Sequence, residues 1–213
     1  MAARFKLPRI YPITDTRLSG ISHVEQVGKL IRGGAEIVQL RDKSATSSSF
    51  YEAAREAVKV ARKHGVLVII NDRVDIAMAV QADGVHLGQD DLPADKAREL
   101  LGDDAIIGLS THSVQQAVDA VAMPIDYVAV GPVFATSTKD RPDPVIGIDG
   151  LGAVRAAIGT TELVAIGGID VSNVSQVLAA GPDSAAIIGS LIGDPGEIEE
   201  RMELLLSRSR TLV

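Results

Sequence analysis

The chain has 213 residues, of which 46% are hydrophobic and only 3% aromatic, and its formal net charge is −7. The hydrophobic fraction predicts a substantial core, aliphatic because aromatics are few, and argues against disorder. The acidic balance argues against a nucleic-acid partner. The chain has no cysteine, which excludes disulfides, thiolate nucleophiles, iron–sulfur clusters and cysteine-based zinc sites.

Neither the first residues of the chain nor its apolar runs suggest a membrane protein. The first ten residues carry Arg4, Lys6 and Arg9 and have no apolar h-region, so we expect no signal peptide. The longest apolar runs, such as Val66–Ile70, are far shorter than the roughly 20 residues that cross a bilayer. We therefore expect a cytoplasmic protein with no membrane partner.

Eight short apolar runs alternate with longer helical patterns along the chain. In one helical pattern, Phe50, Ala54, Ala57 and Val58 recur at i, i+4, i+7 and i+8. Most of the short runs are almost continuously apolar, as expected for parallel strands that are covered on both faces. The predicted strands are Ile10–Asp15, Glu36–Asp42, Leu67–Asp72, Gly84–Gly88, Ile106–Thr111, Tyr127–Val133, Leu163–Gly168 and Ala185–Ser190.

The spacing of these runs predicts the fold class. Each unit takes roughly 25 residues, which is what a strand, a helix and two short loops need. Eight such units, with no Pro/Gly-rich linker between them, favour a single (β/α)8 TIM barrel over residues 1–213. A doubly wound open sheet is the alternative that this pattern leaves open.

Polar residues directly follow most of the predicted strands. In a barrel, these ends meet on the rim where active sites of this fold lie. A plainer interpretation is that loops are polar anyway, although this does not explain why carboxylates, cations and hydroxyls gather at one set of strand ends.

Two neighbouring strand ends carry carboxylates that suit a hard cation. Asp72 ends the third run and Asp91 lies just beyond the fourth, and adjacent strands are about 4.8 Å apart. Mg2+ prefers oxygen ligands and often relies on one or two carboxylates together with substrate phosphates. Alternatively, each aspartate caps the helix that follows it. Asp90 is the less favoured candidate for a Mg2+ ligand, although spacing alone does not distinguish it from Asp91.

Cations and an amide line up after the second strand. Gln39, Arg41 and Lys43 occupy alternate positions, so their side chains point the same way, toward the barrel interior or its mouth. Buried cations need an anionic partner, and a diphosphate would supply one. The alternative is a salt bridge between these cations and a nearby carboxylate such as Asp15.

Three further strand ends suit a phosphorylated ligand. The loop after the sixth strand contains hydroxyls at Thr136 and Thr138 and a cation at Lys139. Gly167–Gly168 and Ile188–Ser190 end the last two strands, where glycines let backbone N–H groups approach an anion. In this fold, the loops after strands seven and eight frequently form a phosphate site.

The four histidines do not suggest a metal centre. His23 and His64 fall on helical patterns, so we expect them at the surface, and we expect His86 to be a satisfied interior histidine. His112 lies at the predicted rim, but no second histidine lies at zinc-ligand spacing.

Taken together, the motifs resemble those of the thiamine phosphate synthase family. They follow the family's order and cover nearly the whole chain, which makes the resemblance specific. The matching segments are Tyr11–Asp15, Gln39–Lys43, Asn71–Asp72, Gly84–Asp91, Gly108–Ser110, Gly131–Phe134, Thr136–Lys139 and Ala165–Ile169.

The resemblance implies a TIM barrel that acts on small phosphorylated substrates. The reaction would join 4-amino-2-methyl-5-(diphosphooxymethyl)pyrimidine to 4-methyl-5-(2-phosphoethyl)thiazole, releasing pyrophosphate and forming thiamine phosphate. CO2 would also leave if the thiazole is carboxylated. Departure of pyrophosphate would leave a pyrimidine-stabilised carbocation, which the thiazole nitrogen would capture, so we expect the enzyme to act through leaving-group stabilisation and positioning.

The resemblance also assigns residues to ligands. Lys139, Arg41 and Ser110 are implied as catalytic groups. Gly189 departs from the serine that the family often has, so a backbone N–H would still serve at this position, while the hydroxyl contact would either be lost or be taken over by Ser190. The implied ligand sets are Gln39, Arg41, Lys43, Asn71, Ser110 and Lys139 for the pyrimidine diphosphate, Asp72 and Asp91 for the Mg2+ cofactor, and Thr136, Thr138, Gly168, Ile188 and Gly189 for the thiazole phosphate.

Two other functions fit parts of the sequence. A related thiazole tautomerase would share the barrel, and His112 at the rim keeps that alternative open. It is not expected to retain the Thr136–Lys139 loop and the full diphosphate set, and these features favour the synthase. A non-catalytic sensor of thiazole phosphate would bind ligand without releasing pyrophosphate.

Overall fold

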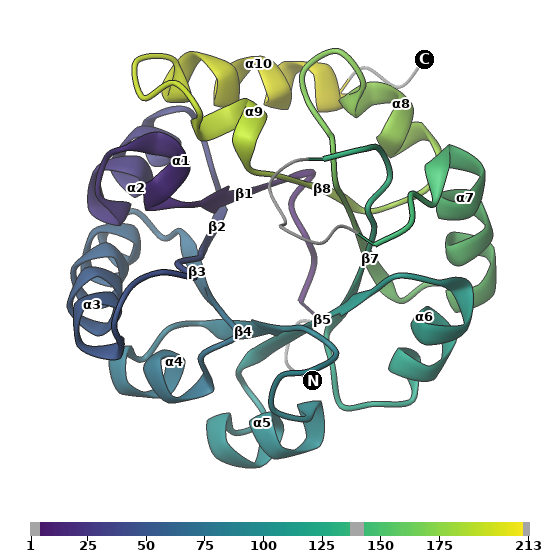
Figure 1. The fold of residues 1–213 in the computed structure, drawn as a ribbon, viewed down its shortest axis with the longest axis horizontal. Helices are drawn as coiled ribbons and strands as arrows, with labels where there is room; N and C mark the ends of the chain where they lie inside the picture. Colours follow the sequence, from purple (N-terminus) through teal and green to yellow (C-terminus); the bar gives the residue numbers. More distant parts are fainter. Residues whose placement is uncertain (1–4, 137–142, 211–213) are drawn as a thin grey trace.

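The computed structural model describes residues 5–136 and 143–210. Within them, eight parallel strands hydrogen-bond in the order β1 to β8, and β8 pairs with β1 to close the barrel. Helices surround the barrel (Figure 1). The predicted (β/α)8 barrel is confirmed, and the open doubly wound sheet is wrong.

All eight strands lie where the apolar runs predicted them, but most end up to three residues earlier. In most cases the strand ladder stops at or just before the polar residues of the rim. The strands are β1 (Ile10–Thr14), β2 (Ile37–Leu40), β3 (Leu67–Asn71), β4 (Gly84–Leu87), β5 (Ile106–Thr111), β6 (Tyr127–Val130), β7 (Glu162–Ile166) and β8 (Ser184–Ile187).

Helices follow the strands, and short extra helices lie after β1 and β8. None of the described helices has both the length and the apolarity that crossing a membrane requires. The helices are α1 (Thr16–Ser19), α2 (His23–Arg32), α3 (Ser47–Lys63), α4 (Val74–Val80), α5 (Ala94–Leu101), α6 (Val114–Val121), α7 (Gly147–Ile158), α8 (Val174–Ala179), α9 (Gly189–Ile192) and α10 (Ile198–Arg210).

The core has two layers. The larger layer lies between the strands and the surrounding helices, and the smaller one fills the barrel itself. The inner layer is mostly aliphatic but contains the rings of Tyr11 and Tyr127, which are 1% and 0% exposed. A Cβ added at Gly108 would lie 2.0 Å from Cζ of Tyr127, so glycine at this position makes room for that ring.

The N-terminal end of the barrel is held by a repeated carboxylate motif. Asp83, Asp126 and Asp183 each immediately precede an even-numbered strand. In each case Oδ2 accepts a hydrogen bond from a backbone N–H of the preceding odd-numbered strand, which ties neighbouring strands together where they start. The donors are the N–H groups of Val68 at 2.7 Å, Ile107 at 2.8 Å and Leu163 at 2.9 Å.

Two arginines complete this motif, and we call the pairs Arg98–Asp126 and Arg155–Asp183 the basal clamps. Arg98 lies 2.8 Å from Asp126, and Arg155 contacts Asp183. Each arginine also donates to carbonyl groups in the turn that leads into the next strand, as Arg155 does to Thr161 at 2.8 Å. The clamps therefore join a helix, a turn and two strands.

Candidate functional site

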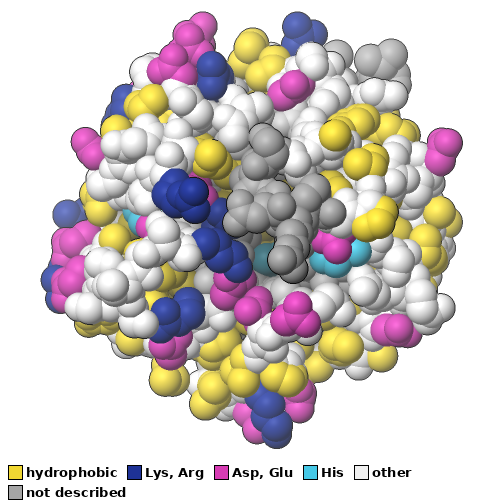
Figure 2. All heavy atoms as spheres, viewed as in Figure 1, with side chains coloured by type: hydrophobic (Ala, Val, Ile, Leu, Met, Phe, Trp, Pro, Cys, Tyr) yellow, Lys and Arg dark blue, Asp and Glu magenta, His cyan; other side chains and the backbone are white. Residues whose placement is uncertain are grey.

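A cavity of about 860 Å³ opens at the C-terminal ends of the strands. Basic and acidic side chains gather near the centre of this face (Figure 2). Thr138 and Lys139 lie outside the described residues, so their placement stays a prediction. The other eleven predicted site residues all line the cavity: Gln39, Arg41, Lys43, Asn71, Asp72, Asp91, Ser110, Thr136, Gly168, Ile188 and Gly189.

Both cations after β2 already have acidic partners. Arg41 contacts Asp15, so the salt bridge considered as an alternative is present. Lys43 contacts Asp72 across the gap between the ends of β2 and β3. Both cations line the cavity all the same, and a guanidinium has five N–H donors, so one carboxylate does not exhaust Arg41.

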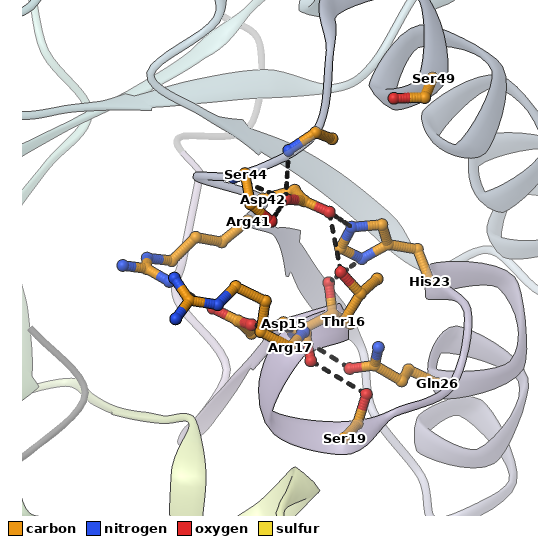
Figure 3. A network of polar contacts seen from close by, with 12 residues as sticks. Asp15, Thr16, Arg17, Ser19, His23, Gln26, Arg41, Asp42, Ser44 and Ser49 are labelled. Carbon is orange, nitrogen blue, oxygen red and sulfur yellow. Dashed lines mark hydrogen bonds and ion pairs between the residues drawn. The ribbon is translucent and has the colours of Figure 1, made fainter.

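The turn that carries Arg41 is held by Asp42 (Figure 3). Its carboxylate accepts from the backbone N–H groups of Ser44 and Ala45 at 2.9 and 2.8 Å and from the Thr16 hydroxyl at 2.8 Å. Burial raises the pKa of Asp42, but these hydrogen bonds outweigh it and lower the pKa to about 2. The residue between the two cavity-lining cations is thus fixed as a carboxylate.

His23 contradicts the expectation of a surface position. It is 2% exposed, its Nδ1 lies 2.7 Å from the Thr14 hydroxyl, and its Nε2 lies 3.5 Å from Asp42. Burial lowers the pKa of His23 despite the nearby carboxylate. As the first residue of α2, His23 faces β1, and helical spacing alone does not reveal which way such a residue points. His64 is exposed, as expected.

Neither Asp72 nor Asp91 caps a helix, so the N-cap alternative is wrong for both. The cap positions of α4 and α5 are Arg73 and Pro93, without a side-chain hydrogen bond. Asp72 instead has a φ of 62°, which is uncommon for a residue other than glycine. Asp91 accepts a hydrogen bond from the Gly88 N–H at 2.7 Å.

The two aspartates share one corner of the cavity. Burial raises the pKa of Asp91, and the neighbouring Asp72 carboxylate raises it further, while the Gly88 N–H and Lys43 oppose this change. Among the described residues, no group of three or more histidine or acidic side chains is placed to hold a metal ion. Any cation bound here would therefore rely on these two carboxylates and on ligand or water oxygens.

On the opposite side of the cavity, glycines allow two segments to pack closely. Gly167 and Gly168 have φ angles of 104° and 65°. A Cβ at Gly167 would lie 2.5 Å from Cβ of Pro132, and one at Gly168 would lie 2.7 Å from the Ala135 carbonyl oxygen. Only glycine satisfies both the backbone angle and the available space, which brings this turn against the segment leading to Thr136.

Gly189 begins the short helix α9, directly after β8. The hydroxyl of the next residue, Ser190, donates to the Ile169 carbonyl oxygen at 2.8 Å. Ser190 therefore does not replace a serine hydroxyl at position 189 as a donor to a ligand. An anion bound at this turn would therefore rely on backbone N–H groups.

A chain of hydrogen bonds runs from the mouth into the barrel interior. Ser110 Oγ lies 2.8 Å from His86 Nε2, and His86 Nδ1 lies 3.0 Å from the Tyr127 hydroxyl. That hydroxyl lies 2.9 Å from the Tyr11 hydroxyl, to which Gln39 Nε2 donates at 3.3 Å. His86 is thus the satisfied interior histidine that was predicted.

Sequence reasoning did not predict that the hydroxyls of Tyr11 and Tyr127 take part in these hydrogen bonds. Burial lowers the pKa of His86 to about 4 and raises the pKa of Tyr11 and Tyr127, so all three groups are neutral at pH 7. One signal was available: the chain has only three tyrosines, and two of them lie in predicted strands.

His112 lies at the rim, as predicted, and it is held by the backbone. Its ring Nδ1 is 2.8 Å from the Gly131 carbonyl oxygen and 3.5 Å from the Asp143 carboxylate. Its backbone N–H donates to the side-chain oxygen of Gln116. The Gly131–Pro132 peptide bond beside it is cis.

A closed parallel barrel with a cavity at the C-terminal ends of its strands, lined in part by charged and polar side chains, has the architecture of the (β/α)8-barrel enzymes. Residues 10–191 match the family model described as thiamine monophosphate synthase. The chain belongs to that family, whose members are transferases of thiamine biosynthesis.

Individual relatives agree over most of their length. The chain is 45% identical to the thiamine-phosphate synthase of Clostridium novyi (strain NT), covering 86% of this chain and 90% of the relative. It is 46% identical to that of Syntrophomonas wolfei, covering 86% and 88%. A solved structure, thiamine phosphate pyrophosphorylase from Pyrococcus furiosus, superposes with a TM-score of 0.87 at 35% identity, covering 96% of each chain.

Proposed function

We propose that this protein joins the pyrimidine diphosphate to the thiazole phosphate, forming thiamine phosphate and releasing pyrophosphate. The observation that carries the proposal is the match to the thiamine monophosphate synthase family over residues 10–191. Relatives about 45% identical, with the same name over most of both chains, support it.

The distribution of side chains around the cavity supports two ligands lying side by side. The residues proposed for the pyrimidine diphosphate come from β2, β3, β5 and the turn after β2, the proposed Mg2+ ligand Asp91 follows β4 between them, and Lys139 is proposed to join them. The residues proposed for the thiazole phosphate come from the loops after β6, β7 and β8, the other consecutive stretch. Ligands bound to these two halves would meet over the barrel axis.

Asp72 and Asp91 fit a Mg2+ ion brought together with the diphosphate. Burial and the neighbouring Asp72 carboxylate raise the pKa of Asp91, so its ionised form favours added positive charge nearby. Lys43 already supplies one such charge at Asp72. Two carboxylates with phosphate and water oxygens are a usual set for this ion. When bound, Mg2+ would stabilise negative charge on the pyrophosphate oxygens.

The proposed reaction needs positioning and charge stabilisation more than a strong base. The bond between the pyrimidine methylene carbon and the diphosphate oxygen breaks, and its electron pair leaves with pyrophosphate. The thiazole nitrogen then donates its lone pair to the same carbon. Arg41, Lys43 and Lys139 would donate hydrogen bonds to the departing oxygens, while Gln39 and Ser110 orient the ring.

The test incubates the purified protein with both substrates, with and without Mg2+, and measures pyrophosphate and thiamine phosphate. We expect both products in equal amounts, and only when both substrates and Mg2+ are present. Conversion of the thiazole alone, without Mg2+ or pyrophosphate release, would indicate the tautomerase instead. Ligand binding without either product would indicate the sensor.

A further inference from the structure

We propose that the outer face of α6 and α7 is the contact surface of a homodimer, in which a second copy of this chain covers it through a two-fold axis. The inference is independent of the proposed function, because this surface lies on the side of the barrel and not in the cavity at the mouth (Figure 1). We call it the α6–α7 face and define it by its exposed residues: Val114, Val118 and Val121 on α6, and Ala153, Ala156 and Ala157 on α7.

α6 presents a row of valines to solvent. Ala117 and Ala120 bury the side of α6 that faces the barrel, whereas Val114, Val118 and Val121 are 38%, 41% and 42% exposed. Their spacing of i, i+4 and i+7 places the three valines along one side of the helix. Single exposed hydrophobic residues are ordinary, but a contiguous row of them marks an interaction surface.

α7 packs against α6 and extends this surface with small side chains. Its exposed alanines are joined by two larger residues at the ends of the helix pair: Met123, 44% exposed, two residues after α6, and Val145, 52% exposed, two residues before α7. Of the ten large hydrophobic side chains that are exposed among the described residues, five thus lie on these two helices or next to them. Exposed apolar surface is therefore concentrated on this side of the barrel.

The same two helices carry few charges. Asp119, Asp149 and Arg155 are their only charged residues, and Arg155 is held in a basal clamp. By contrast, α3 and α10 each have six charged residues. In Figure 2, no Lys or Arg side chain of the described residues is visible on the side where Figure 1 places α6 and α7. Depletion of charge is the compositional mark of the core of a protein–protein interface.

The shape of the face favours a second copy as its partner. In an isologous dimer, both subunits use the same patch, so each feature of the patch has to find its complement within that patch. The α6–α7 face has such a pair of features, because α6 carries the larger valines and α7 carries the smaller alanines. A two-fold rotation would lay the valine row of each copy on the alanines of the other.

The charge of the chain also favours contact between copies at this face. Each copy has a formal net charge of −7, so two copies repel each other over most of their surface. The repulsion is weakest where both surfaces carry almost no charge. The Asp119 carboxylate beside the valine row accepts a hydrogen bond from Gln115 at 2.9 Å on its own helix. A strongly charged partner would find few groups here to pair with its charges.

The test measures the oligomeric state of the purified protein. Two short helices make a small interface, so we expect a reversible dimer with a micromolar dissociation constant. Sedimentation velocity at roughly 1 to roughly 300 μM protein brackets that range and should show a monomer that converts to a dimer as the concentration rises. A wild-type protein that stays monomeric over the whole range overturns the proposal and leaves the face to a different protein.

Three glutamate variants locate the contact. Val118→Glu and Ala153→Glu place a carboxylate on the α6 and α7 sides of the face. Leu204→Glu is the matched control, because Leu204 is a hydrophobic helix residue that is 45% exposed, close to the 41% of Val118, but lies on the charged helix α10. Far-UV circular dichroism and urea unfolding establish that each variant is folded, and Ala153→Glu keeps the test open if Val118→Glu does not fold.

We expect Val118→Glu and Ala153→Glu each to raise the dissociation constant of the dimer about 100-fold or more, because each brings two unpaired like charges into a desolvated contact. Leu204→Glu should keep the dissociation constant of the wild type. A dimer that persists unchanged in folded Val118→Glu and Ala153→Glu overturns the proposal, since another face would then make the contact. The same holds if Leu204→Glu weakens the dimer as much as they do.

Discussion

The two ends of the barrel carry the same kinds of charged residues in different surroundings. At the N-terminal end, Asp183 accepts a backbone N–H of β7 and contacts Arg155, so its charge completes the pairing of two strands. At the mouth, Asp91 accepts one N–H from its own turn and lies beside a second carboxylate, Asp72.

This difference distinguishes the basal aspartates, whose charges stabilise the fold, from the mouth aspartates, whose charges we expect to bind a ligand. The basal clamps satisfy each carboxylate within the protein, so removing one should cost stability and spare activity. The mouth carboxylates are only partly satisfied, so removing one should cost activity and spare stability. Natural active sites often trade stability for function in this way.

The largest effect should be the loss of turnover when a charged side chain at the mouth is replaced by a neutral one. Asp72→Asn and Lys139→Ala should each lower turnover by about 10²–10³-fold, the scale of one preorganised electrostatic contact. Asparagine is chosen at position 72 because it tolerates the positive φ of 62° found there. Steady-state assays with saturating Mg2+ measure the effect, urea unfolding provides the stability control, and full turnover in both variants contradicts the assignment.

Beneath the mouth, His86 should make stability depend on pH. Its pKa is about 4 in the folded protein and about 6.5 when unfolded, so the unfolded chain binds more protons between these values. Stability should therefore fall as the pH drops from about 6.5 to about 4, by about 3 kcal/mol in total from this group. The check is to measure the free energy of unfolding of wild type and His86→Gln in urea across this pH range. The prediction is contradicted if the two free energies change with pH in parallel.

The sequence predicted the mouth better than the base. At the mouth, residues such as Gln39, Arg41 and Asp72 lie near the C-terminal ends of apolar runs, and the closure of a parallel barrel brings all strand ends together. At the base, Asp183 looks like any acidic loop residue, because its N–H partner lies 20 residues away on another strand. Local spacing does not reveal such a partner.

The sequence also did not predict contacts inside the barrel or the direction of side chains at the ends of helices. Tyr11 and Tyr127 are 116 residues apart and meet only because the barrel closes with both rings turned inward. His23 was expected at the surface because helical periodicity says little about the first residue of a helix. The roles of the mouth residues toward ligands stay predictions, since they depend on molecules that bind there.

At the base, Asp183→Ala should lower the free energy of unfolding by about 1–3 kcal/mol, because the Leu163 N–H loses its acceptor and Arg155 loses its carboxylate partner. Turnover at a temperature where the variant is folded should not change. Asp104→Ala, an exposed aspartate in the turn before β5, is the matched control and should have almost no effect. A loss of turnover with unchanged stability would reverse the assignment of the two ends.

The smallest effect should have the opposite sign. Asp91→Asn, measured without Mg2+ at neutral pH, should slightly raise the free energy of unfolding, by less than Asp183→Ala lowers it. Burial and Asp72 raise the pKa of Asp91, so at pH 7 its ionised form is less favourable in the folded protein than in the unfolded chain. Asparagine removes that charge and keeps an oxygen for the Gly88 N–H.

Adding Mg2+ makes this last comparison sharper. If the two carboxylates hold the ion, Mg2+ with pyrophosphate should stabilise the wild type against unfolding and stabilise Asp91→Asn much less, because a ligand that binds only the folded state raises its stability. Asp183→Asn should keep the wild-type response, since it leaves the mouth untouched. If Mg2+ with pyrophosphate stabilised the wild type and Asp91→Asn equally, Asp91 would not be a ligand of the ion, whatever the substitution does to stability without Mg2+.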